Sequence, residues 1–119
     1  MLGRRHRFHG YGAVRRLYDH STVVRGPLLQ LRYRNNNAER PYRVAVVVSR
    51  KVHKSAVVRN RIRRRIYELI RINDQTVPAG CDIVVSVYSD AVAELPAAKL
   101  QQSVIDMLQK IDTNPSKTP

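Results

Sequence analysis

Apolar residues recur along this chain with the two periods that distinguish helices from strands. Between Lys54 and Arg71 they follow one another at spacings of four, four, three and one residues: Val58, Ile62, Ile66, Leu69 and Ile70. This spacing forms one face of a helix, so we predict an amphipathic helix from about Ala56 to Ile72, with Ser55 as its N-cap. A second apolar series predicts a helix from Ala97 to Ile111: Leu100, Val104, Met107, Leu108 and Ile111.

Three other segments have the patterns of β-strands. Leu28 to Arg34 alternates apolar and polar residues, which is typical of a half-buried strand. Arg43 to Ser49 is β-branched and almost entirely apolar, so we predict a central strand that is covered on both faces. Asp82 to Tyr88 is a third strong strand. The asparagines at residues 35–37 predict a turn, and therefore a hairpin between the first two of these strands.

The segments outside these elements complete an α+β arrangement. Ala13 to His20 has the character of a short helix, and Ser21 to Pro27 is predicted to be a connection that is partly extended. Residues 1–10 are expected to form a mobile basic arm, and residues 112–119 a flexible tail. We therefore predict a single-domain α/β sandwich over the whole chain. Its central sheet has about four strands, with the basic helix between two strands and further helices near each terminus.

Positive charge is concentrated in the first part of the chain. Residues 1–65 contain 18 Lys and Arg against two acids, whereas residues 66–119 contain four Lys and Arg against seven acids, which together give the net charge of +13. Arginine is the most frequent cation, and its guanidinium fits phosphate well. A general solubility bias would not concentrate charge in this way, so we predict a nucleic acid partner. An acidic protein partner is the alternative.

Several classes of protein are disfavoured by the composition. Cys81 is the single cysteine, so it forms no internal disulfide and has no zinc-ligand spacing; we predict a buried core residue in a reducing cytoplasm. No apolar run approaches the length of a membrane span, and residues 1–10 lack the apolar segment of a signal peptide. The four histidines are scattered, and no nucleotide-binding glycine motif occurs. We therefore predict no catalytic residue, bound metal or small-molecule substrate.

The predicted basic helix contains the main candidate site. Its outward positions are almost all cationic, and Asn60 adds hydrogen-bonding groups for phosphate or ribose. Glu68 is the one acid there, and we expect it to lie within reach of Arg64 and Arg65. A solvated helix face would normally mix charges of both signs, so this face favours a polyanion.

A second candidate site lies near the N-terminus. Val14 and Tyr18 are four residues apart on the predicted first helix, next to Arg15, and Tyr11 precedes them. Aromatic rings beside arginines can stack on single-stranded bases while holding their backbone. The alternative is that Tyr18 anchors the helix to the sheet, and both interpretations stay open. Arg32 and Arg34 alternate along the first predicted strand. Together with Arg40 and Arg43, they form either a solvated edge or a wall of the groove that binds the single strand.

The segment SRKVHKSAVVRNRIRRRIYELIR, residues 49–71, resembles the signature of the bacterial ribonuclease P protein component. That family has a basic loop, then Ala-Val, then Arg-Asn-Arg, a basic pair and a Glu on one helix. The corresponding positions here are Ala56-Val57, Arg59-Asn60-Arg61, Arg64-Arg65 and Glu68. The resemblance extends over roughly residues 6–111. Val14 departs from it, because the family often has an aromatic residue there.

The resemblance implies a fold with a left-handed crossover through the basic helix, against the general right-handed rule. It also implies the protein subunit of ribonuclease P, which binds the catalytic RNA and the 5′ leader of precursor tRNA and promotes endonucleolytic removal of the leader. The RNA would carry out the hydrolysis with Mg²⁺, and the protein would bind no cofactor and no membrane. The other hypotheses are a structural RNA-binding protein of the ribosome and a stand-alone nuclease.

The resemblance and the charge pattern together predict two sets of binding residues. The set for the catalytic RNA comprises Arg50, Lys51, Lys54, Arg59, Asn60, Arg61, Arg63, Arg64 and Arg65. The set for the leader comprises Tyr11, Val14, Arg15, Tyr18, Arg32 and Arg34.

Overall fold

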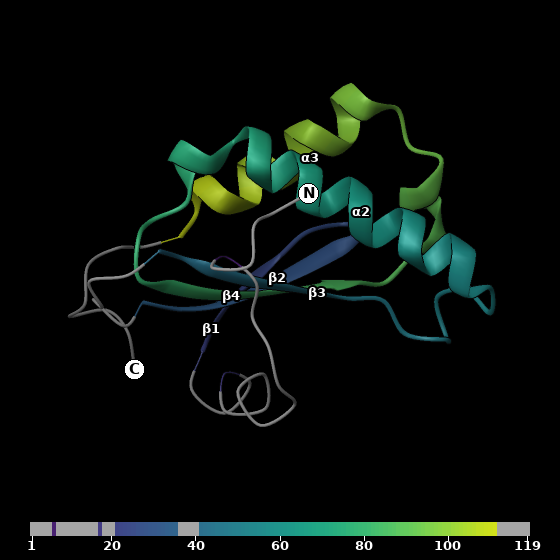
Figure 1. Cartoon of the computed structure of the whole chain (residues 1–119), viewed down its shortest axis with the longest axis horizontal. Helices are drawn as coiled ribbons and strands as arrows, with labels where there is room; N and C mark the ends of the chain where they lie inside the picture. Colours follow the sequence, from purple (N-terminus) through teal and green to yellow (C-terminus); the bar gives the residue numbers. More distant parts are fainter. Residues whose placement is uncertain (1–5, 7–16, 18–20, 36–40, 112–119) are drawn as a thin grey trace.

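Two helices pack on one face of a four-stranded sheet in the computed structural model, which describes residues 6, 17, 21–35 and 41–111 (Figure 1). The strands are β1 (Thr22–Arg25), β2 (Leu29–Asn35), β3 (Arg43–Val47) and β4 (Cys81–Val87). The helices are α2 (Ala56–Ile72) and α3 (Ala97–Gln109), with short 3-10 helices η2 (Asp74–Thr76) and η3 (Asp90–Ala93). The predicted α+β class and the number of strands are confirmed. The predicted arm, tail and turn lie outside the described residues, as does all of the predicted first helix except Leu17.

Helix α2 begins and ends where its sequence predicts. The hydroxyl of Ser55 accepts a hydrogen bond from the Val58 N–H at 3.4 Å, which confirms the N-cap. The N–H of Asn73 donates to the Leu69 carbonyl at 3.1 Å and closes the last turn. The predicted apolar stripe packs into the core: Ile62, Ile66, Leu69 and Ile70 are buried, and Val58 is half-buried.

The strand order β1-β2-β4-β3 corrects two predictions. Strand β3 is an edge strand paired only with β4, and its Val47 is exposed, so it is not the predicted central strand. Strand β4 lies between β2 and β3, which excludes the predicted hairpin between them. Strand β4 is an inner strand that pairs with β2 on one side and β3 on the other, and its residues are nearly all buried.

The hairpin of the sheet lies one element earlier than predicted. Thr22–Arg25 forms strand β1, in the segment predicted to be partly extended, and it pairs antiparallel with β2. The N–H of Gly26 donates to the Leu29 carbonyl at 2.9 Å to close the turn. A side chain at Gly26 would come within 3.2 Å of the Met107 sulfur, so the missing Cβ lets the hairpin pack tightly against α3.

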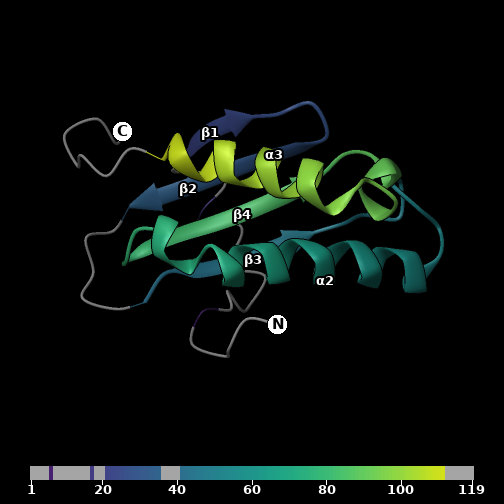
Figure 2. The same cartoon turned by 90° about the horizontal axis from the view of Figure 1, so that it is seen from above.

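Strands β3 and β4 are adjacent and parallel, and α2 connects them. In Figure 2, seen from the helix side with both strands pointing right, the chain passes from β3 through α2 to β4 above it. A right-handed connection would place β4 on the other side of β3, so this crossover is left-handed, as the resemblance implied.

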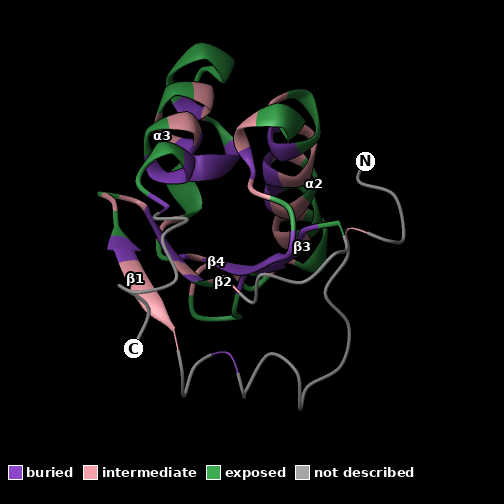
Figure 3. Cartoon of the chain, turned by 90° about the vertical axis from the view of Figure 1, so that its left-hand side faces the viewer, coloured by how far each residue is buried: buried purple, intermediate pink, exposed green. Residues whose placement is uncertain are grey.

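The two faces of the sheet differ in how they are covered. Figure 3 shows α2 and α3 side by side over one face, where the core lies. The opposite face, called the open face here, has only Leu17 from the described residues packed on it, against Ala45 and Val84. Side chains alternate between the faces along each strand, so Gln30, Arg32 and Arg34 belong to the open face.

Candidate nucleic-acid interface

The outward surface of α2 has two flanks that meet at Arg64. Successive residues of a helix are rotated by about 100°, so Arg64 lies opposite the buried stripe. Arg61, Arg65 and Glu68 follow one another on the side of α2 that faces η3; we call this the η3 flank. The other side faces strand β3 and carries Asn60, Arg63 and Tyr67; we call this the β3 flank.

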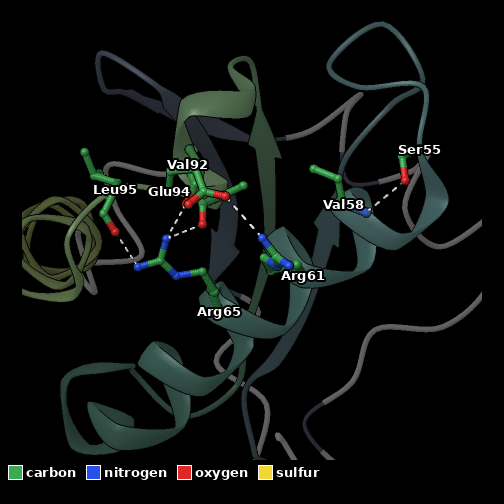
Figure 4. A network of polar contacts seen from close by, with 8 residues as sticks. Ser55, Val58, Arg61, Arg65, Val92, Glu94 and Leu95 are labelled. Atoms are coloured by element: carbon green, nitrogen blue, oxygen red, sulfur yellow. Dashed lines mark hydrogen bonds and ion pairs between the residues drawn. The ribbon is translucent and has the colours of Figure 1, made fainter.

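The cations of the η3 flank are bonded within the protein (Figure 4). Arg61 forms an ion pair with Glu94 at 3.1 Å. The guanidinium of Arg65 donates to the carbonyls of Val92 at 2.6 Å and Ala93 at 2.9 Å, and also to the carbonyl of Leu95. Arg65 therefore satisfies carbonyls at the end of η3 and fixes that segment against α2.

The β3 flank has a different chemistry. The hydroxyl of Tyr67 accepts a hydrogen bond from the Val46 N–H at 3.1 Å and so covers part of the exposed edge of β3. Asn60 accepts a hydrogen bond from Arg63. With Arg64, these three residues line a groove of about 330 Å³. Within the described part of the chain, no acidic side chain lines this groove.

The loop before α2 is held by the first arginine of the Arg-Asn-Arg motif. Arg59 donates to the carbonyls of His53 at 3.0 Å and Lys54 at 2.9 Å. The N–H of Ser55 donates to the ring nitrogen of His53 at 3.0 Å. The side chains of Arg50, Lys51 and Lys54 are left exposed on this braced loop. Arg59, predicted to bind RNA, thus has a structural duty in the loop.

A groove of about 530 Å³ crosses the open face at the carboxyl ends of β3 and β4. Its cationic wall comes from Arg25, Arg32 and Lys51, which approach from three different segments. Tyr88 is exposed beside it, and the tyrosine hydroxyl donates to the buried Gln30 side chain. An aromatic face with surrounding cations is suited to a single-stranded nucleic acid.

Of the described residues that were predicted to bind the leader, the structure brings only Arg32 to the open-face groove. Arg32 lines the open-face groove, whereas Arg34 lies in register with Asp82, away from the groove. Tyr11, Val14, Arg15 and Tyr18 lie outside the described residues. The sequence analysis missed Arg25, Gln30 and Tyr88. Tyr88 could have been found, since it continues the alternation of β4 beyond Ser86 and so reaches the open face.

Two acids of the sequence have partners that spacing did not reveal. Asp82, which has no evident partner in the sequence, accepts two hydrogen bonds from Arg43 on the neighbouring strand, at 2.9 and 3.0 Å. This bonding raises the pKa of Arg43. Glu68 forms an ion pair with Arg71, and it lines a groove together with Arg64 and Arg65, near which it was predicted to lie. The Arg71 guanidinium lowers the pKa of Glu68 to about 2, so the carboxylate stays ionised at neutral pH.

A cluster of Tyr42, His6 and Asp74 lies near the carboxyl end of α2. Tyr42 is buried, and its hydroxyl donates to Asp74 at the start of η2. The ring of His6 stacks on Tyr42 with their centroids 4.1 Å apart, and His6 also hydrogen-bonds to the Tyr42 carbonyl. Burial and the hydrogen bond to Asp74 raise the pKa of Tyr42.

Neither a metal-binding cluster nor a membrane-spanning helix occurs among the described residues 6, 17, 21–35 and 41–111. No group of three or more His, Cys, Asp or Glu side chains in these ranges could hold a metal ion. No helix among them is long and apolar enough to cross a membrane.

A cationic helix above a mixed sheet, with a cationic groove on the sheet's open face, defines a class of small α+β proteins suited to polyanions. The Ribonuclease P family model matches residues 2–112. The chain therefore belongs to the ribonuclease P protein family.

Curated relatives carry the name ribonuclease P protein component. The one from Stutzerimonas stutzeri is 34% identical over 98 residues, which are 82% of this chain and 72% of the relative. The one from Roseiflexus castenholzii is 38% identical over 74 residues, or 62% of this chain and 60% of the relative. The match to the Chloroflexus aurantiacus relative covers 58% of that protein, so the chain spans less than two thirds of some relatives.

Solved structures share the fold. The RNase P protein from Thermotoga maritima matches with a TM-score of 0.81 at 22% identity, covering 91% of this chain and 99% of the other. The Staphylococcus aureus RNase P protein matches with a TM-score of 0.75 at 23% identity, covering 87% and 93%. These similarities support the two-layer arrangement with its mixed four-stranded sheet.

Proposed function

We propose that this chain is the protein subunit of ribonuclease P and assists endonucleolytic removal of the 5′ leader from precursor tRNA. The observation that carries the proposal is the pairing of two cationic surfaces in a chain of this family. One surface is the outward side of α2 with its preceding loop, and the other is the open-face groove beside Tyr88.

In this proposal the two surfaces bind two different RNAs. The catalytic RNA lies on α2 and on the loop that carries Arg50, Lys51 and Lys54. The leader lies in the open-face groove, where Tyr88 stacks on a base while Arg25 and Arg32 neutralise phosphates. The predicted N-terminal residues Tyr11, Val14, Arg15 and Tyr18 also belong to the leader site in this proposal. Leu17, the one described residue of the predicted first helix, packs against Ala45 and Val84.

In this proposal the RNA subunit carries out the hydrolysis with Mg²⁺ that is bound to the RNA. The protein contributes binding energy to the substrate that is lost once the leader is cut away, so it favours precursor over mature tRNA. It also neutralises phosphates where two RNAs approach each other, which lowers the Mg²⁺ concentration needed. The protein acts in the cytoplasm, with its substrate, and binds no cofactor of its own.

Reconstitution tests the proposal. The purified chain is mixed with a bacterial ribonuclease P RNA and precursor tRNA at a Mg²⁺ concentration too low for the RNA alone. Restored 5′ cleavage is the expected result. Absence of any rescue would contradict the proposal and leave a structural ribosomal role, and cleavage by the protein without RNA would identify a nuclease.

The groove is tested separately with two substrates, one with a leader of about eight nucleotides, enough to fill a single-strand site, and one with a single-nucleotide leader. Tyr88→Ala should weaken binding of the long-leader substrate about tenfold, because stacking on one base contributes roughly 1–3 kcal/mol. Tyr88→Phe keeps the ring and is the matched control. Equal losses of affinity for both substrates would show that Tyr88 does not contact the leader.

A further inference from the structure

We infer that RNA lies along the β3 flank and the Arg64 ridge of α2, and that the η3 flank takes no part in RNA binding. The RNA on α2 then meets the leader in the open-face groove over the loop before α2, so the two binding surfaces form one continuous track. This inference rests on the proposed function and deepens it, since it divides the cations of the Arg-Asn-Arg helix into two groups.

The cations of the η3 flank are already bonded within the protein. Arg61 faces Glu94, and all three hydrogen bonds of Arg65 go to backbone carbonyls near η3. The groove on this side is also lined by Glu68. A phosphate entering it would meet the Glu68 carboxylate, would compete with Glu94 for Arg61, and would have to displace the Arg65 bonds that hold η3 in place. The negative charges of a carboxylate and a phosphate in the same groove repel each other, which opposes binding.

The β3 flank and the ridge offer the opposite conditions. In the described part of the chain, Arg64 makes no side-chain hydrogen bond or ion pair, and Arg63 bonds only to Asn60, which is neutral. Val57 precedes Arg64 by seven residues and so lies on the same side of the helix, where it is 68% exposed. A large apolar side chain next to unneutralised cations fits a surface that a sugar–phosphate backbone covers.

Continuity with the open face comes from the loop between β3 and α2. Arg59 fixes the backbone at His53 and Lys54, and therefore limits the positions that the Lys54 side chain can reach. Lys51 in the same loop lines the open-face groove. Figure 2 shows this connection leaving the carboxyl end of β3 and entering the first turn of α2. The track therefore passes around the carboxyl end of β3.

The experiment compares three variants that each remove one positive charge from the same helix: Arg63→Gln, Arg64→Gln and, as the matched control, Arg61→Gln. The affinity of each is measured over a range of salt concentrations, for ribonuclease P RNA and for an unrelated structured RNA of equal length. Circular-dichroism spectra establish that the variants are folded. The slope of log affinity against log salt reports how many phosphates the protein neutralises.

Arg63→Gln and Arg64→Gln should each reduce that slope by roughly 0.7–0.9, the value for one phosphate contact. Their affinity should fall on the order of tenfold, as expected for the loss of a charge-assisted hydrogen bond. Arg61→Gln should leave the slope unchanged and the affinity within about twofold, since its partner is Glu94. A slope loss for Arg61→Gln as large as for Arg64→Gln would overturn the inference.

The two RNAs keep this result apart from the proposed function. If Arg63 and Arg64 alone reduce the slope on both RNAs but ribonuclease P RNA is neither preferred nor activated, the track stands as a general RNA-binding surface and the proposed function fails. If ribonuclease P RNA is activated but all three variants lose slope equally, the proposed function stands and the division of the helix is wrong.

Discussion

Arg64 and Arg65 are neighbours in the sequence, yet they belong to regions with different duties. Arg65 donates three hydrogen bonds to carbonyls around η3, whereas Arg64 has no bonded partner among the described residues. A rotation of about 100° between adjacent helix positions separates them. A run of arginines on one helix is therefore not one binding surface, because each guanidinium bonds to whatever lies opposite it.

Stability gives the largest expected difference between these two residues. Arg65→Ala removes charge-assisted hydrogen bonds and releases the η3 segment, so the free energy of unfolding should fall by about 2 kcal/mol. Arg64→Ala should change it by less than about 0.5 kcal/mol, as for other exposed sites. Thermal melts followed by circular dichroism measure both. Equal melting temperatures for the two variants would show that the hydrogen bonds of Arg65 are not stabilising.

The β3 flank contains one structural residue, and it sharpens the comparison. Tyr67→Phe loses the hydrogen bond from the Val46 N–H and should lower the free energy of unfolding by about 1 kcal/mol. It keeps every cation of the flank, so the salt slope of RNA binding should be unchanged. Urea denaturation gives the first value, and amide exchange at Val46 should accelerate. Unaltered exchange at Val46 would argue that the tyrosine does not protect the strand edge.

The end of α2 provides a prediction about pH. The pKa of Tyr42 is raised in the folded protein, so Tyr42 favours folding while it is protonated. Its contribution should be complete below the pKa of an unfolded tyrosine, near 10, and should be lost as the pH rises from there towards the folded pKa. Above that value, the free energy of unfolding of Tyr42→Phe should therefore depend less on pH than that of the unaltered protein. The same pH dependence in both proteins would show that deprotonation of Tyr42 does not affect stability.

Glu94→Gln should change stability least. It should also make the η3 flank resemble the β3 flank in RNA binding. Arg61 and Glu94 are both largely exposed, so Glu94→Gln should alter the free energy of unfolding by less than about 0.5 kcal/mol. Arg61 then lacks its carboxylate, and the salt slope of RNA binding should steepen by up to roughly 0.9. Asp106→Asn, on α3, is the control for charge alone. A slope identical to that of the control would mean that Glu94 does not shield Arg61.

Local signals predicted the elements better than their arrangement. The bounds of α2 were predicted correctly because its cap and its apolar spacing both lie within the segment. Strand β3 was expected to be central because its sequence is as apolar as that of a buried strand, but pairing with β4 left it at the edge. Strand order depends on contacts between distant segments, and a strand's own residues do not specify its neighbours.

The candidate site shows the same limit at the level of single side chains. The cationic helix and Arg32 were predicted from charge and period. The alternation of β4 could also have placed Tyr88 on the open face, but its hydrogen bond to Gln30 follows only from the pairing of β2 with β4. Glu94 likewise gave no signal, since it lies 33 residues from Arg61 in the sequence.

An amphipathic helix with an arginine-rich outward surface follows from the sequence alone, because helical period and charge are local properties. Which of those arginines remain available to a partner depends on the tertiary packing. Packing η3 against one flank supplies Arg61 with a carboxylate and Arg65 with carbonyls. The other flank meets the edge of β3, where backbone and a tyrosine offer no negative charge, so its cations stay available for the RNA contact that we propose.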